Sequence, residues 1–181
     1  MKRFLQIFKI PDLRKKVLAV AFLLVVFRAF AAIPIPGIDA ARLEAFFQSN
    51  QLFGFLNVFT GGGLSSLSIV MLGVGPYITA SIIMQLLTII FPKLKKAYHE
   101  EGAEGRAKFN RYSRLLTVPL AIIQAYGFLN LLASQGAIPV MSLGPLLANV
   151  VIITAGSIFI MWLGELITAY KIGNGTSLII F

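Results

Sequence analysis

The stretch SIVMLGVGPYITASIIMQLLTIIF, from Ser68 to Phe91, contains no charged residue and stops at Pro92. An α-helix rises about 1.5 Å per residue, so about 20 apolar residues cross a hydrocarbon core about 30 Å thick. The stretch is long enough for this, and the proline that follows cannot donate a hydrogen bond to a continuing helix. It predicts a membrane-spanning helix.

Three further apolar stretches meet the same criterion. The first stops at a Pro–Ile–Pro–Gly cluster, and the last is followed by a Gly–Asn–Gly turn. The middle one contains Pro119, which a membrane helix tolerates because neighbouring helices satisfy the freed carbonyl. We therefore expect an all-α, polytopic membrane helix bundle. The expected spans lie at about residues 17–33, 68–91, 115–133 and 146–168, with the start of a fifth at 175–181.

Composition and charge agree with a membrane protein. Hydrophobic residues make up 57% of the chain and charged residues 13%, which is too apolar for a soluble domain. The net charge of +9 comes from short basic runs between apolar stretches, before the first span and between the second and third. The other loops carry almost no charge. By the positive-inside rule, we expect the N-terminus to be cytoplasmic.

Residues 1–16 alternate apolar side chains with lysine and arginine. This pattern predicts a cytoplasmic amphipathic segment that lies on an anionic membrane surface, and a solvated basic tail is the alternative.

Residues 53–67 are apolar but are interrupted by Gly61, Gly62 and Gly63, and they are too few to span a bilayer. Backbone outside a helix is tolerated at membrane depth only inside protein or beside a water-filled cavity. Two interpretations remain open from this spacing: a re-entrant segment that lines a vestibule, and an ordinary extracytoplasmic loop.

Signatures of catalysis are missing from the sequence. The single histidine, His99, lies in a polar stretch among glutamates and has no zinc-type spacing around it. The chain has no cysteine, no phosphate-binding glycine loop with its lysine and no nucleophile elbow. We expect no enzyme activity, no catalytic, metal or cofactor-binding residue, and no cofactor.

Ionisable residues within the expected spans are few. Arg28 and Glu165 lie near helix ends, where we expect them to reach the membrane interfaces, and they do not form an ion relay. The neutral polar residues Thr79, Gln85 and Gln124 lie within spans, where interhelical hydrogen bonds contribute about 1 kcal/mol or less. A helix pair joined by such weak contacts could also open sideways.

Five motifs, in this order and at this spacing, resemble those of the SecY family over essentially the whole chain. They are IPIPGID (33–39), FTGGGLSSLSI (59–69), GPYITASIIMQLL (75–87), EGAEGRAKFNRYSR (101–114) and MWLGELITAYKIGNGTSLIIF (161–181).

The resemblance implies a channel subunit that passes unfolded secretory proteins across the membrane and membrane proteins laterally into it. The family fold has two halves of five helices that close like a clamshell around a pore, and residues 17–181 correspond to the N-terminal half. The glycine-rich stretch at about 57–67 corresponds to the plug half-helix of the family. The residues implied for the plug are Gly61, Gly62, Gly63, Leu64, Ser65, Ser66, Leu67 and Ser68.

The resemblance also implies a ring of branched apolar side chains at the pore, here Val74 and Ile78 on the second helix and Thr176 and Ile180 on the fifth. Each pair is spaced i, i+4, so its members share one helix face. Such a collar excludes water and ions. Thr176 departs from the mostly aliphatic pattern of the family. The second and third helices form one side of a lateral gate, for which Thr79, Gln85 and Gln124 are the candidates.

The partners implied are SecE-like and SecG-like small membrane subunits, unfolded preproteins with signal sequences, and membrane lipids. A SecA-type motor ATPase or a ribosome would dock mostly on the half that is absent here, and no direct contact with nucleic acid is implied. The compartment implied is the bacterial inner membrane. Two alternatives remain: half of a small-solute secondary transporter, and a structural membrane subunit that conducts nothing.

Overall fold

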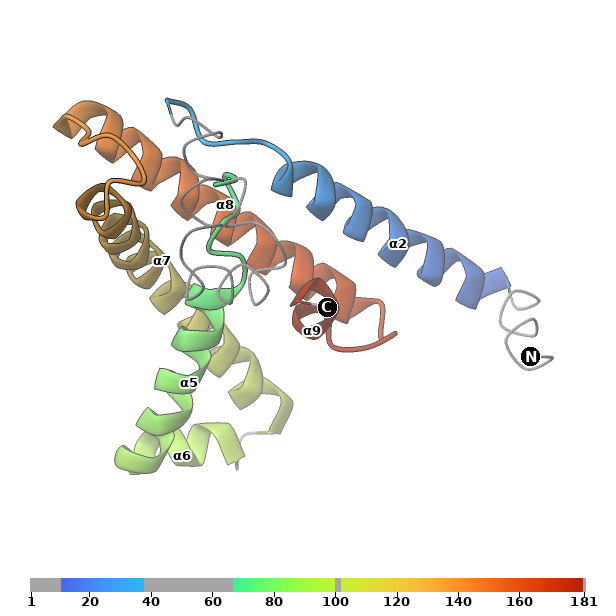
Figure 1. The fold of residues 1–181 in the computed structure, drawn as a ribbon. Coiled ribbons are helices and arrows are strands. Elements are labelled where there is room, and N and C mark those ends of the chain that lie inside the picture. Colours follow the sequence, from blue (N-terminus) through green and yellow to red (C-terminus); the bar gives the residue numbers. More distant parts are fainter. Residues whose placement is uncertain (1–10, 38–66, 100–101, 181) are drawn as a thin grey trace.

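The computed structural model describes residues 11–37, 67–99 and 102–180 (Figure 1). These residues are helical and contain no strand, and their one isolated β-bridge joins Pro34 to Ser68. The expectation of an all-α fold is confirmed for them. The helices are α2 (Pro11–Ala31), α5 (Gly75–Ile90), α6 (Pro92–His99), α7 (Gly102–Ser134), α8 (Leu143–Ala169) and α9 (Gly175–Ile180).

Two of these helices, α7 from Glu104 and the whole of α8, could cross a membrane by length and composition. They contain the expected spans 115–133 and 146–168. Helix α5, with 16 residues, is shorter than the expected span at 68–91. Helix α2 starts at Pro11, inside the expected N-terminal amphipathic segment, and residues 1–10 lie outside the described residues.

Helix α5 begins at Gly75 rather than at Ser68 because the backbone before it cannot be helical. Leu67 and Gly73 have φ angles of 37° and 52°, in the left-handed region, which a right-handed helix does not include. Pro76 then lies at the start of the helix, where its missing N–H costs nothing. The apolar character of residues 68–74 therefore reflects burial and not helix.

The stretch between the second and third expected spans is helical, where a polar loop was expected. Helix α6 starts at Pro92, and α7 starts about four turns before its apolar part. No proline interrupts the polar turns of α7, and Glu104 forms an i, i+4 ion pair with Lys108 at 3.3 Å. Hydropathy marked where the apolar part of the helix begins, which is not where the helix begins.

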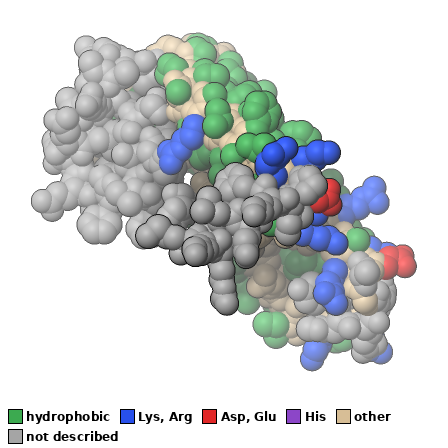
Figure 2. All heavy atoms as spheres, turned by 90° about the vertical axis from the view of Figure 1, so that its right-hand side faces the viewer, with side chains coloured by type: hydrophobic (Ala, Val, Ile, Leu, Met, Phe, Trp, Pro, Cys, Tyr) green, Lys and Arg blue, Asp and Glu red, His purple; other side chains and the backbone are tan. Residues whose placement is uncertain are grey.

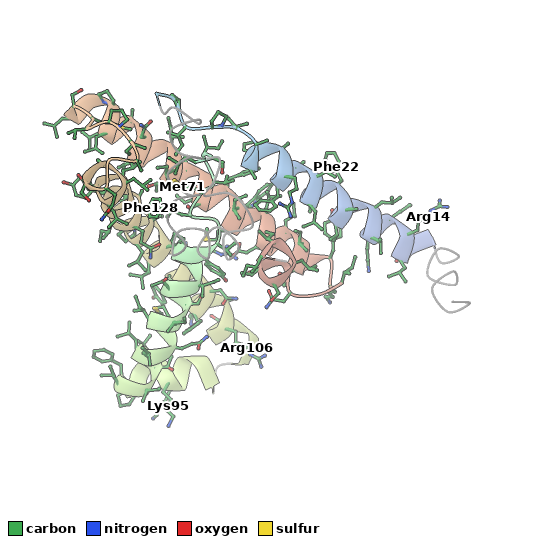
Figure 3. All side chains as sticks on the ribbon, viewed as in Figure 1. Arg14, Phe22, Met71, Lys95, Arg106 and Phe128 are labelled. Atoms are coloured by element: carbon green, nitrogen blue, oxygen red, sulfur yellow. The ribbon has the colours of Figure 1, made fainter. Side chains whose placement is uncertain are left out.

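Helix α8 is the central element, because α2, α5, α7 and α9 all contact it. In one buried cluster, Leu129 and Leu132 of α7 pack with Ile153 of α8 and with Leu67 and Met71. Figure 3 shows Met71 turned toward the space between α7 and α8, whereas Phe22 points away from the bundle.

A second buried cluster joins α2, α5, α8 and α9. Its members include Phe27, Val74, Ile160, Leu163 and Ile179. The two clusters meet along α8, so one helix carries the core from end to end.

Basic side chains gather where α2 begins, where α6 connects α5 to α7, and where α8 ends. Figure 2 shows most of the visible lysines and arginines in the centre and lower right of one face, with a continuous hydrophobic surface above them. We call this the basic end. Its exposed residues include Arg14, Lys15, Lys95, Lys96, Arg106 and Arg111.

Candidate functional site: a cavity between α5, α7, α8 and α9

A cavity of about 850 Å³ lies between the first and middle turns of α5, the first turns of α7, the end of α8 and the start of α9. Its wall mixes neutral polar, apolar and two charged side chains. It lies toward the basic end. The residues that line it include Tyr77, Ile78, Ser81 and Gln85 of α5, Asn110 and Arg114 of α7, Glu165 and Thr168 of α8, and Asn174 and Thr176 at the start of α9.

The start of α9 is held on α8 by a close backbone approach and by hydrogen bonds. A Cβ atom on Gly175 would lie 1.9 Å from the carbonyl oxygen of Gly164, so only glycine fits there. The Gly175 N–H donates to Thr168 Oγ1 at 2.9 Å, and the side chain of Asn174 accepts from the Thr176 N–H at 3.1 Å, as an N-cap does. These contacts fix Thr176 on the cavity wall.

The four residues expected for the pore ring occupy three different environments. Ile78 and Thr176 line the cavity from α5 and α9. Val74 is buried, one turn before Ile78, in the cluster that also contains Ile179. Ile180 is 44% exposed on the surface of this chain. The structure therefore brings Ile78 and Thr176 together, with Val74 beyond them in the core and Ile180 facing outward.

Of the residues implied for the plug, Gly61–Ser66 lie outside the described residues. Leu67 and Ser68 are buried, with 1% and 0% exposure. The Ile35 N–H donates to the Leu67 carbonyl at 2.9 Å, and the Ile69 N–H donates to the Ile33 carbonyl at 3.0 Å. The segment that follows the glycine-rich stretch is thus fastened to the end of α2.

The lateral-gate candidates are also separated. Gln85 is exposed and lines the cavity, whereas Gln124 lies half-buried on α7 away from it. The Thr79 hydroxyl donates to the Gly75 carbonyl of its own helix at 3.0 Å. That bond lies within one helix and does not join two helices.

A feature that the sequence did not predict is an ion pair across the cavity wall. Arg114 of α7 donates from Nε to Glu165 Oε1 of α8. The residues are 51 positions apart, so no helical periodicity pairs them. The sequence signal for this ion pair was a single acidic residue, Glu165, within an otherwise apolar span.

The other ionisable residue expected within a span is Arg28, whose guanidinium carbon lies 5.9 Å from the ring centre of Phe27.

The wall of the cavity is suited to holding a polar chain. Within residues 11–37, 67–99 and 102–180, no group of three or more His, Cys, Asp or Glu residues is placed to hold a metal ion. On the cavity wall, neutral hydrogen-bond donors and acceptors alternate with aliphatic side chains. The polar residues include Tyr77, Ser81, Gln85, Asn110 and Asn174. Such a wall can solvate a peptide backbone without binding one sequence tightly.

Comparison with known proteins identifies the relatives of this chain. Residues 68–181 match the SecY family. The chain is 43% identical to the protein translocase subunit SecY of Streptomyces scabiei, over 98% of this chain and 44% of that protein. It is 45% identical to that of Synechocystis sp., over 98% of this chain and 40% of that protein. The chain thus spans less than half the length of these curated relatives.

The fold is also similar to that of a solved structure. Sec61 in the canine ribosome-channel complex from the endoplasmic reticulum superimposes with a TM-score of 0.60 and 25% sequence identity. The match covers 89% of this chain and 34% of that chain.

Proposed function

Because the chain belongs to the SecY family, we propose that it forms the N-terminal half of the pore of a protein translocase. Its passengers are unfolded preproteins, which cross the membrane, and membrane proteins, which leave the pore sideways into lipid. Its contribution is passive, without a catalytic step or a cofactor. This chain covers 44% of the Streptomyces scabiei relative. The rest of the pore would come from the part of the full-length protein that corresponds to the remainder of that relative.

The proposal rests on the cavity that Ile78 and Thr176 both line. A polar vestibule that narrows onto branched side chains can admit a hydrated chain and still exclude ions when empty. Val74, next to Ile78 and already buried, is the inner edge of this collar. Ile180 is exposed at the edge of the chain, where the second half would complete the ring.

For the plug, the fastened end sets a limit on any movement. Leu67 and Ser68 are buried and their segment is hydrogen-bonded to residues 33–35, so a displacement of the plug has to begin before Leu67. We therefore narrow the proposed moving part to Gly61–Ser66.

Orientation and partners follow from charge and family. We place the basic end in the cytoplasm of a bacterial cell, at the inner membrane, by the positive-inside rule. The cavity lies toward this end and is the entrance for the passenger. SecE-like and SecG-like subunits would surround the bundle, and a SecA-type motor or a ribosome would deliver the passenger. The Sec61 relative was solved in a ribosome-channel complex.

Crosslinking from the pore residues tests the proposal. The full-length protein in its native complex, with one cysteine at Ile78, Thr176 or Ile180, is loaded with a stalled secretory chain that carries a thiol-reactive probe. We expect adducts at all three positions. The matched control is Ile123→Cys on α7, which is 66% exposed and does not line the cavity, and it should give no adduct. A stalled chain that inserts normally but forms no adduct at the three positions would favour a non-conducting structural subunit.

A further inference from the structure

The Arg114–Glu165 ion pair separates two spaces of different character. On one side lies the polar cavity, and both residues line it. On the other side both line a groove of about 580 Å³ between α7 and α8. The rest of that groove is apolar, with Phe159, Met161 and Trp162 among its residues. The pair is therefore part of the wall between the vestibule and a surface suited to hydrocarbon.

The carboxylate of this pair is more buried than that of an ordinary surface pair. The side chains of Glu165 and Arg114 are 23% and 49% exposed, whereas the surface pair within α7, Glu104 with Lys108, has side chains 78% and 51% exposed. Fully exposed pairs contribute little because water and salt screen them. A partly buried carboxylate that loses its partner keeps the cost of its desolvation.

The position of the pair makes it sensitive to movement of α7. Helix α7 packs along α5, and these are the two helices that would form one side of the lateral gate. Helix α8 belongs to both buried clusters, and α7 joins it in the first one through Leu129 and Leu132, about four turns after Arg114. A gate that opens by moving α5 and α7 therefore strains the joint at which α7 meets α8.

We infer that Arg114 and Glu165 form a latch that holds α7 on α8 in the closed channel and thereby sets how strong a signal sequence must be to open it. This inference rests on the proposed function. The latch stabilises only the arrangement in which α7 lies against α8. Its loss therefore shifts the equilibrium toward the open state and lets weaker signal sequences succeed.

Export of a passenger with a weakened signal sequence tests the latch in the full-length complex. Glu165→Gln removes the charge at nearly constant volume, and Arg114→Gln removes it with a shorter side chain; each should raise export about fivefold, equivalent to about 1 kcal/mol in the opening equilibrium. The double variant Arg114→Glu with Glu165→Arg should bring export back toward the wild-type level. Glu104→Gln is the matched control, because it breaks the surface pair within α7, and it should change nothing.

Unchanged export in both single variants, or an equal rise in the control, would overturn the latch while leaving the translocase function in place. A second measurement does not depend on export. Spin labels at the exposed positions Arg111 and Ala169 report the separation of α7 and α8 in the idle complex. We expect Glu165→Gln to broaden this distance distribution, and the charge-swapped pair to narrow it. An unchanged distribution also rejects the latch. If the wild-type complex exports no passenger and Glu165→Gln still broadens the distribution, the proposed function fails and only the mechanical joint remains.

Discussion

Helices α7 and α8 are both long and apolar enough to span a membrane, yet the protein buries them to different extents. In the most apolar window of α8, 50% of the residues are buried inside the protein, against 28% in α7. Composition alone does not distinguish them. The difference lies in which helices surround each apolar part: α8 contacts α2, α5, α7 and α9, whereas α7 contacts α5, α6 and α8 (Figure 1).

The two helices bury different patterns of residues. On α7 the buried positions form one stripe with a spacing of about four residues, which includes Thr117, Ala121 and Ala125. On α8 the buried positions cover a wider face, and Gly156 and Ser157 lie side by side within it. A single stripe leaves most of the surface of α7 exposed in this chain. The wide face of α8 leaves little freedom for substitution.

Introducing a methyl group at a helical glycine should give the largest difference in stability change between the two helices. A Cβ atom at Gly156 of α8 would lie 2.0 Å from the carbonyl oxygen of Ile69, whereas one at Gly127 of α7 would meet nothing within 4 Å. Gly156→Ala should destabilise the protein by about 3 kcal/mol or more, because backbone and not a flexible side chain must move. Gly127→Ala should be neutral or stabilising by up to about 1 kcal/mol, the difference in helix propensity.

Thermal unfolding of the full-length complex in detergent measures both glycine variants. Equal melting temperatures for Gly156→Ala and wild type would show that α8 does not cross the 67–74 segment as closely as described.

Truncating an isoleucine on each helix gives the second largest contrast. Ile160 of α8 is fully buried, and Ile123 of α7 is 66% exposed. Ile160→Ala should cost about 2 to 4 kcal/mol, from lost burial and from the cavity that remains. Ile123→Ala should change stability by no more than about 0.5 kcal/mol. The same melting assay measures the pair, and a large loss at Ile123 would mean that a partner helix covers this face of α7 in the complex.

How far the sequence predicts this fold depends on which signal is used. The apolar runs at 115–133 and 146–168 identify the interiors of α7 and α8, because a long run with almost no charge is typical of a helix that crosses hydrocarbon. The ends of the helices are missed because hydropathy reports the surroundings of a segment, lipid or water, and not its backbone conformation. The turns of α7 before Arg114 are polar and helical, and residues 68–74 are apolar and not helical. Gly73 and Pro76 marked the true start of α5.

Prediction of the candidate site from sequence is weaker, because the site depends on contacts between distant segments. Periodicity places Val74 and Ile78 on one face of a helix, but it does not show that Ile78 shares a cavity with Thr176. That pairing was implied by family resemblance alone. The ion pair between Arg114 and Glu165 had neither signal, because it depends on how α7 crosses α8. Local rules describe helices, and the site arises where helices meet.

Removing a buried hydroxyl from each helix should give the smallest contrast, a gain of stability on α8 against almost no change on α7. Ser157 Oγ of α8 is buried and has no hydrogen-bond partner among the described residues. Ser113 of α7, also buried, donates to the Phe109 carbonyl at 3.1 Å. An unpaired buried hydroxyl carries a desolvation cost of about 1 kcal/mol or more, so Ser157→Ala should raise stability by about that amount. For Ser113→Ala the lost hydrogen bond and the better helix propensity of alanine offset each other to within about 0.5 kcal/mol. A loss of stability in Ser157→Ala would instead mean that the hydroxyl has a partner in the assembled protein, and that α8 is held there by a polar contact as well as by packing.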